Sequence, residues 1–532
     1  MTTEQRIPNM PARNPWLTDS PHPVSRVSSA APDGVPFAGP TGGRKLTRDQ
    51  VTAVPVLFVS NPTIKKAGDD VVVLAPGTLG IQKIIATGDA FELVTSFPYP
   101  GLEARAQRVN DRAIATALRE VDAARRGGDD ARLAAAPELL AKLGLDFGTA
   151  VNGVSNLIDK DGFHTCVYGG TNVLKTTDDN VARGPLRVVR RVDLAESLPP
   201  DVARRVPRVL GAAMTYDGFL ALVGPGALIV LDRDLETRGF VTFGDETVDN
   251  GVAVDEQGGI YVVTSRRMLK VVWDGRGLST DERDGAWDSA YNTMSGEIAL
   301  AMGAVSRGSG TTPTLMGFGD DPHKLVVIAD ADERGTNAVA FWRDEIPAGF
   351  AQKAGTKSRR IADQTRIDVS KLTIEPSPEV LGYGVAFLNS AFPRPTKVPG
   401  LGNAFVSGVT RPAPLGIQKL SWNPDRLAFE RAWTNPDIDN TDWLVPSISA
   451  ATGEMYVGHK EHGDYQVVGL DWTTGAVKDR WELPDDSRAW NGYGGVATIL
   501  DNADLMIGGV FALKRVHVGA AGPHASGAAT RA

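Results

Sequence analysis

The chain contains almost none of the residues that build disulfide frameworks or zinc clusters. Cysteine occurs once among 532 residues, at Cys166, so no disulfide can form within the chain and no cysteine-rich zinc site can exist. Only seven histidines are present, and none stands in the His-Glu-x-x-His pattern of helical zinc sites. These absences exclude disulfide scaffolds and the common zinc motifs.

Long apolar runs and an excess of positive charge are also missing. No stretch approaches the 18 apolar residues of a membrane-spanning helix, and the N-terminus holds no apolar segment of signal-peptide length. The formal net charge of −8 offers no basic surface to nucleic acid and disfavours anionic membranes. We therefore expect a soluble, cytoplasmic protein whose partner is a small molecule, with no role for nucleic acid or a membrane.

Short strands that open on small residues recur along the chain. The clearest is "TVDNGVAVDEQGGIYVVTS" at residues 247–265, and related stretches begin at Val151, Gly382 and Tyr493. Each has a small residue, then Val-Ala or Val-Ser, then an apolar run. Their spacing corresponds to one or several units of ~40–50 residues, the size of a four-stranded propeller blade.

A second internal match supports the same unit. "LGIQKIIATGDAFELVTSF" from Leu79 parallels "LGIQKLSWNPDRLAFERAW" from Leu415, and each is expected to form the two outer strands of a blade. The sequence predicts an all-β propeller over residues 51–518, with eight blades favoured and seven as the alternative. The expected units centre on residues 54–100, 148–194, 207–245, 247–280, 308–350, 379–436, 441–485 and 490–518, and the first and last units could share one closing blade.

Three segments depart from this β pattern. Residues 1–50, rich in Pro, Ser, Gly and Arg, are expected to be a disordered or extended arm. Residues 102–146 are rich in alanine, with Ile114, Leu118 and Val121 at helical spacing, and predict a helical hairpin that either covers a site or packs on the ring. Residues 519–532 hold few large apolar side chains and are expected to be a disordered tail.

The Asn-Gly pair at the start of the 247–265 stretch has two interpretations. Innermost strands line the channel of a propeller, where glycine lets backbones approach closely, so the glycine is expected to be structural. Asn250 offers a carbonyl oxygen to a hard cation and an amide to a substrate, and Asn152 holds the same position in another repeat. Alternatively, Asn-Gly is simply a favoured turn pair.

Acidic residues precede Asn250 in the same loop. Asp249 and Glu246 are the candidate catalytic carboxylates, because with Asp245 they could complete a cation site near the channel mouth. The alternative is a solvated acidic turn.

A loop rich in glycine and hydroxyl side chains is the candidate substrate-binding segment. In "SRGSGTTPTLMG", residues 306–317, Ser309, Thr311 and Thr312 offer hydroxyl groups beside backbone N–H groups. Tyr383 and Tyr493, from two other strand-opening repeats, are further candidate substrate contacts. A flexible linker between blades is the alternative for this loop.

Two stretches resemble a known superfamily. "DNGVAVDEQGGIYVVTS" and "KLVVIADADERGTNAVAFW", from Lys324, are similar to blade strands of the gluconolactonase, senescence marker protein and strictosidine synthase superfamily. The resemblance implies a propeller whose central channel holds a divalent cation, usually calcium, with Asn250 and Asn152 as candidate ligands. The chain departs from that pattern because no Asp directly precedes the glycine in the aligned repeats.

Three hypotheses for function follow. The first is metal-assisted hydrolysis of a lactone or ester in the central channel, where the cation polarises the carbonyl and a carboxylate activates water. The second is a quinoprotein-like, cofactor-dependent oxidoreductase, although the ten tryptophans form no regular repeat. The third is a propeller that binds a ligand or a protein without catalysis, since one fold serves many functions.

Overall fold

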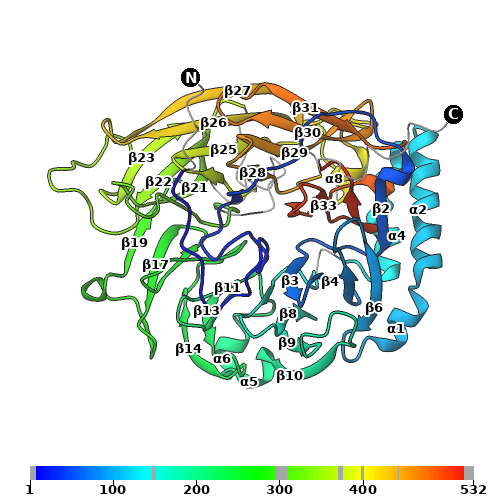
Figure 1. The fold of residues 1–532 in the computed structure, drawn as a ribbon. Coiled ribbons are helices and arrows are strands. Elements are labelled where there is room, and N and C mark those ends of the chain that lie inside the picture. Colours follow the sequence, from blue (N-terminus) through cyan, green and yellow to red (C-terminus); the bar gives the residue numbers. More distant parts are fainter. Residues whose placement is uncertain are drawn as a thin grey trace.

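The protein is a ring of eight antiparallel sheets around a central channel, as Figure 1 shows. The structure is a computed structural model, and it describes residues 8–146, 151–294, 306, 308–369, 376–396, 401–440 and 442–519. Each sheet is one blade, with its first strand innermost. The prediction of an eight-bladed propeller is confirmed.

The strands of the first four blades follow in chain order. They are β3 (Thr63–Ala67), β4 (Asp70–Pro76), β5 (Gly80–Ile85) and β6 (Glu92–Pro98); β7 (Asn156–Ile158), β8 (His164–Tyr168), β9 (Asn172–Thr177) and β10 (Arg187–Asp193); β11 (Gly211–Met214), β12 (Leu220–Gly224), β13 (Ala227–Leu231) and β14 (Thr237–Thr242); and β15 (Ala253–Val254), β16 (Gly259–Val263), β17 (Arg267–Trp273) and β18 (Leu278–Ser279), with β19 (Trp287–Ala290) also paired to β17.

The other four blades complete the ring. They are β20 (Thr314–Met316), β21 (Leu325–Asp332), β22 (Gly335–Trp342) and β23 (Ile361–Arg366); β24 (Glu379–Leu381), β25 (Gly384–Leu388), β26 (Leu415–Asn423) and β27 (Ala428–Asp439); β28 (Ser447–Ser449), β29 (Glu454–Glu461), β30 (Asp464–Asp471) and β31 (Val477–Glu482), with β1 (Gly34–Val35) parallel to β28; and β32 (Ala497–Ile499), β33 (Leu505–Ile507), β34 (Ala512–Val516) and β2 (Val51–Pro55).

Burial explains the residue pattern of each blade. The middle strands β12 and β13 are buried along their whole length because neighbouring blades cover both faces, which favours continuous apolar runs. The outer strand β14 alternates between exposed and half-buried positions. The two "LGIQK" segments form β5 with β6 and β26 with β27, the third and fourth strands of two blades, as predicted.

The ring closes by joining the two ends of the propeller. β2 pairs antiparallel with β34 over residues 51–55 and 512–516 and forms the outermost strand of the last blade. The first blade has four strands of its own, so the first and last units do not merge. Closure gives β34 a partner on its outer side, where an unpaired edge would otherwise invite pairing with another chain.

The helical insertion packs against the last blade and a later helix. It comprises α1 (Glu103–Arg108), α2 (Asp111–Arg126), α3 (Asp130–Ala134) and α4 (Ala136–Leu143). Ile114 and Val121 of α2 share a core with Phe511 and with Phe405 of α8 (Leu401–Val406). α2 ends before Gly127, and the Asp129 side chain accepts a bond from Arg132 N to start α3.

The remaining helices in the described part of the chain are short. They are α5 (Leu194–Ser197) and α6 (Pro200–Ala203), with 3₁₀ turns at Arg48–Gln50, Glu282–Asp284 and Arg488–Trp490. Across the described residues, no helix has both the length and the hydropathy to cross a membrane.

Buried lysines on the third strands link neighbouring parts of the ring. Five lysines on these strands have side chains that are less than 10% exposed: Lys83, Lys175, Lys270, Lys419 and Lys514. The ammonium group of each donates to a main-chain carbonyl outside its own strand. The acceptors of Lys83 are the carbonyls of Val181 and Gly184, both at 2.8 Å. The repeated lysine is a structural signal that was present in both "LGIQK" segments.

The N-terminal segment lies extended on the ring and then enters the channel (Figure 1). Leu17 and Val24 form backbone bridges to Asp159 and Leu157 in the second blade. Farther along, Ser29 O accepts a bond from Val254 N and Ala30 O accepts one from Leu315 N. The arm thus contacts innermost strands of several blades.

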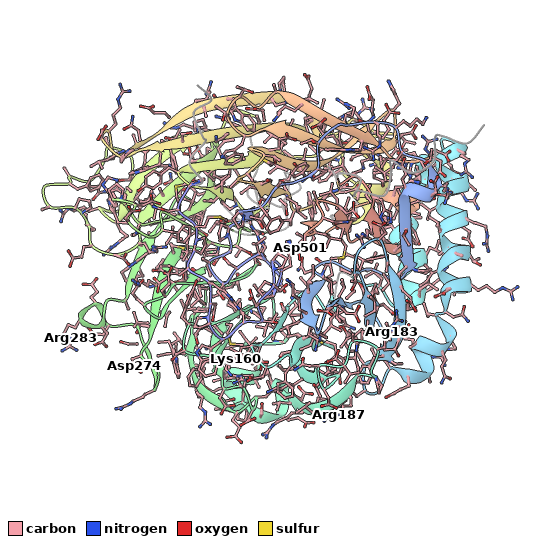
Figure 2. All side chains as sticks on the ribbon, in the orientation of Figure 1. Lys160, Arg183, Arg187, Asp274, Arg283 and Asp501 are labelled. Carbon is pink, nitrogen blue, oxygen red and sulfur yellow. The ribbon has the colours of Figure 1, made fainter. Side chains whose placement is uncertain are left out.

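Several exposed charged side chains lie at the rim of the ring. Figure 2 shows Arg187, Asp274 and Arg283 at the edge of the molecule. Arg183 pairs with Glu92 and Arg187 with Asp179, and all four of these side chains are more than half exposed. Such exposed ion pairs contribute little to stability, because water screens the charges.

Candidate functional site

A cavity of about 480 Å³ occupies the central channel. The loop before the innermost strand of every blade contributes to its wall, so all eight blades converge on one site. Representative lining residues, one for each blade, are Asn61, Ser155, Arg208, Asn250, Thr312, Ser377, Trp443 and Tyr493. A volume of this order accommodates a small molecule.

The N-terminal arm forms the floor of this cavity. Ser25, Arg26, Ser28 and Ser29 line it together with the strand-opening loops. The Ser29 hydroxyl donates to Met214 O at 2.8 Å, and Met214 is the last residue of β11. The arm therefore lies toward the far end of the innermost strands and closes the channel beneath the cavity.

Asn250 lines the cavity, but both polar atoms of its side-chain amide already form hydrogen bonds within the protein. Its Nδ2 donates to Gly310 O at 2.7 Å, and its Oδ1 accepts from Gly251 N at 2.9 Å and from the Thr312 hydroxyl at 3.0 Å. These bonds join the fourth blade to the loop that opens the fifth. A Cβ on Gly251 would lie 3.0 Å from the Thr312 hydroxyl oxygen, and a Cβ on Gly211 would lie 2.5 Å from the Gly251 Cα, so the two backbones approach closely here.

Asn152 occupies the matching repeat position but does not line the cavity. Its Nδ2 donates to Thr78 O at 2.7 Å, and its Oδ1 accepts from Gly169 N at 2.8 Å. The side chain connects the first blade to the second. The structure therefore does not bring the two asparagines together at one cavity.

The two candidate catalytic carboxylates differ in environment. Asp249 lines the cavity and is exposed. Glu246 is buried and does not line the cavity; its carboxylate accepts from Arg267 Nε at 2.8 Å and from the Thr264 hydroxyl. Asp245 pairs with Arg266 on the surface. Glu246 thus stabilises the turn between β16 and β17.

The hydroxyl loop is folded on itself. Ser309 and Thr311 are buried, with their hydroxyl oxygens 2.7 Å apart, and neither lines the cavity. Thr312 does line it, and its backbone N–H donates to the Ser377 hydroxyl at 2.9 Å. Of the three predicted contacts in this loop, Thr312 is the one within reach of a ligand in the cavity.

Only one of the two candidate tyrosines lines the cavity. Tyr383 lies at the turn between β24 and β25 and exchanges bonds with the backbone of His323, at 2.9 and 3.0 Å; it does not line the cavity. Tyr493 does, and its ring stacks on Trp443 with centroids 6.2 Å apart. Burial raises the pKa of Tyr493, so its hydroxyl stays protonated.

The described residues do not fit a calcium site at Asn250. The Oδ1 of Asn250 already accepts two hydrogen bonds, and the side chain of Asn152 is hydrogen-bonded to the first and second blades outside the cavity. No group of three or more His, Cys, Asp or Glu side chains within the described ranges is arranged to hold a metal ion. The divalent cation stays a prediction, and no chemical step is derived from it.

Replacing Asn250 with alanine is expected to lower the free energy of unfolding by about 1–3 kcal/mol. The change leaves Gly310 O and Gly251 N without their bonds to the asparagine side chain. Urea denaturation with and without EDTA measures the effect. Equal losses in both conditions support a structural asparagine, whereas destabilisation of the wild type alone by EDTA would identify Asn250 as a metal ligand.

Several residues that line the cavity were not predicted from the sequence. Arg26 comes from the arm, Glu379 begins β24, and Phe58 and Trp443 contribute aromatic rings. Phe58 and Trp443 both have φ of 52°, a strained value for bulky side chains that is typical of functional sites. Local sequence carries no signal for these residues, apart from the isolated tryptophan in "NTDWLVP".

Comparison with known proteins yields one partial relative. No protein-family model matches the chain. An uncharacterized protein from Archaeoglobus fulgidus is 29% identical over 291 residues, which cover 50% of this chain and 53% of that protein. The chain thus spans about half the length of the curated relative that it matches.

Solved structures with a similar fold are β-propellers of several kinds. Quinohemoprotein alcohol dehydrogenase from Comamonas testosteroni is 11% identical, with 96% of this chain and 82% of that chain covered and a TM-score of 0.48. The Cps50 (Swd1) propeller domain from Myceliophteria thermophila is 9% identical, with 66% and 92% covered and a TM-score of 0.37. A candidate 6-phosphogluconolactonase from Bacteroides uniformis is 13% identical, with 61% and 82% covered and a TM-score of 0.34. At these identities the likeness concerns the fold alone.

Proposed function

We propose that the central cavity binds a neutral, polar small molecule and that the protein hydrolyses a lactone or ester bond of this molecule. The observation that carries the proposal is the convergence of all eight strand-opening loops on one cavity of about 480 Å³ that holds a buried carboxyl group, Glu379. A buried carboxyl group beside a ligand is suited to acid–base chemistry.

The charges of the cavity favour a neutral ligand. Two basic side chains, Arg26 and Arg208, and two acidic ones, Asp249 and Glu379, line it. Arg26 is also paired with Asp33 behind it. A site without excess charge gives no advantage to a nucleotide or a dicarboxylate, whereas a lactone or ester needs only polar and apolar contacts.

Two further observations support the substrate class. Phe58, Trp443 and Tyr493 provide apolar surface on one wall, while Asn61, Ser155 and Ser377 offer amide and hydroxyl groups elsewhere. The two stretches that resemble the gluconolactonase superfamily point to the same kind of bond. The metal of that superfamily is not used in the proposal, because Asn250 lacks a free oxygen.

The test is a hydrolysis assay on a panel of neutral lactones and carboxylic esters, with and without EDTA. Ala212 lines the cavity, and Ala212→Phe is expected to lower kcat/KM at least about tenfold by displacing the substrate. Val188→Phe, on the exposed outer strand β10, is the matched control and should keep wild-type activity.

Two outcomes would contradict the proposal. Binding of panel compounds that is blocked by Ala212→Phe, without any hydrolysis, would make the protein a ligand-binding propeller. Hydrolysis that is lost in EDTA and restored by calcium would instead return the divalent cation to the reaction.

A further inference from the structure

A buried cluster of two carboxyl groups and one guanidinium group lies at the floor of the central cavity. Asp33 and Arg26 come from the N-terminal arm and Glu379 from the start of β24. Arg26 Nη2 donates to Asp33 Oδ2 and, at 3.1 Å, to Ala31 O, and it lies 3.9 Å from Glu379 Oε2. Asp33 and Glu379 are 0% and 2% exposed.

The cluster has one acidic group more than it has basic groups. Glu379 Oε2 and Asp33 Oδ1 are both buried, and no third group donates a hydrogen bond to either atom. Burying a carboxylate without a donor is costly, so two such acceptors in one cluster indicate a shared proton. Burial, the charge of Asp33 and a hydrogen bond to Asp33 raise the pKa of Glu379 well above its usual range.

Glu379 is the member of this cluster that combines burial with access to a ligand. It lines the cavity, as does Arg26, whereas Asp33 stands behind them. The other acidic side chain of the cavity wall, Asp249, is exposed to solvent. Arg26 and Asp33 are the charged groups that act on Glu379, and both belong to the N-terminal arm.

We propose that Glu379 is the catalytic proton donor of the cavity and that Asp33 and Arg26 are positioning residues: Asp33 keeps the proton on Glu379, and Arg26 holds Asp33 in place. This inference rests on the proposed function and deepens it. Water adds to the acyl carbon, and Glu379 transfers its proton to the alkoxy oxygen as the acyl C–O bond breaks. The proton released by the water then returns to the Asp33–Glu379 pair, so the pair ends as it began.

The arm is therefore part of the active site in this mechanism. Arg26 donates to Asp33 and fixes its carboxylate, and the negative charge of Asp33 favours a protonated Glu379. Two of the three groups reach the channel only because residues 25–35 run along the innermost strands, where Ile448 N donates to Asp33 O at 3.0 Å.

The first experiment measures hydrolysis by Glu379→Gln against Glu92→Gln, the same substitution at an exposed position of the outer strand β6, with melting temperatures as a folding check. Loss of general acid catalysis is expected to lower kcat by about 10²–10⁴-fold in Glu379→Gln, while Glu92→Gln keeps the wild-type kcat. A Glu379→Gln enzyme that retains wild-type kcat would overturn the proposal while the hydrolase function stands.

The second experiment examines the positioning role of Asp33. Asp33→Asn removes a negative charge that raises the pKa of Glu379, so the alkaline limb of the pH–rate profile is expected to move to lower pH. A purely structural role for Asp33 would lower activity without moving that limb, and this result would contradict the assignment.

A third readout does not depend on turnover. At pH 7 the infrared difference spectrum between the wild type and Glu379→Gln should contain the carbonyl stretch of a protonated carboxylic acid. Presence of this band without hydrolysis of any substrate would refute the hydrolase function but retain the protonated Glu379. Absence of the band would refute the shared proton itself.

Discussion

Deletion of residues 1–55 is expected to abolish folding of the propeller. The deletion removes β2, which supplies the outermost strand of the last blade. It also removes Leu17, Val24, Leu46, Val51 and Val54, each 7% exposed or less. Burial of each such side chain contributes about 1.5–3 kcal/mol, so together they approach the whole stability of a typical protein, about 5–15 kcal/mol.

The truncated chain should be found in aggregates, because β34 would become an open edge strand. Expression followed by size-exclusion chromatography measures this outcome. A finer comparison uses two substitutions in β2, where Val54 is buried and Ala53 exposed. Val54→Asp should destabilise the protein strongly and Ala53→Asp hardly at all; equal effects of the two would show that β2 does not close the ring.

Asp178→Asn is expected to lower the free energy of unfolding by about 3–5 kcal/mol, which is the typical cost of removing one charged partner of a buried ion pair. The Asp178 carboxylate lies 2.5 Å from Lys65 Nζ and 2.7 Å from Lys83 Nζ. All three side chains are at most 1% exposed. Without the carboxylate charge, two ammonium groups would share one buried site.

The neighbouring residue provides a matched control. Asp179 pairs with Arg187, and both side chains are more than half exposed. Asp179→Asn should therefore cost little stability, because water screens this pair, and asparagine tolerates the positive φ of 54° at this position. Urea denaturation of the two variants and the wild type measures the difference, and similar losses for both would refute the buried network.

The effect of Asp178 should also depend on pH. Burial alone would raise its pKa, but hydrogen bonds from Lys65 and Lys83 outweigh burial and lower it. A carboxyl group whose pKa is lowered by folding stabilises the protein above its unfolded pKa of about 3.9, and this contribution disappears as the pH falls through the folded pKa. The stability difference between wild type and Asp178→Asn should therefore narrow below about pH 4.

The sequence did not predict which of the candidate residues line the cavity. Asn250 and Asn152 occupy equivalent repeat positions, yet Asn250 lines the cavity and Asn152 joins two blades. Thr312, Tyr493 and Asp249 also line the cavity, whereas Glu246, Ser309, Thr311 and Tyr383 do not. Within one loop, the direction of each side chain depends on packing against the next blade, and local sequence does not encode that direction.

The sequence by itself determined the repeating unit of this protein. Strand-opening repeats, the paired "LGIQK" segments and the helical spacing of residues 102–146 are local patterns, and each reflects the burial of a strand or helix within a few residues. The tertiary structure alone decided that Arg26 and Asp33 meet Glu379 in the channel. That meeting depends on ring closure and on the path of the N-terminal arm, which are non-local and are set by the burial of the whole ring.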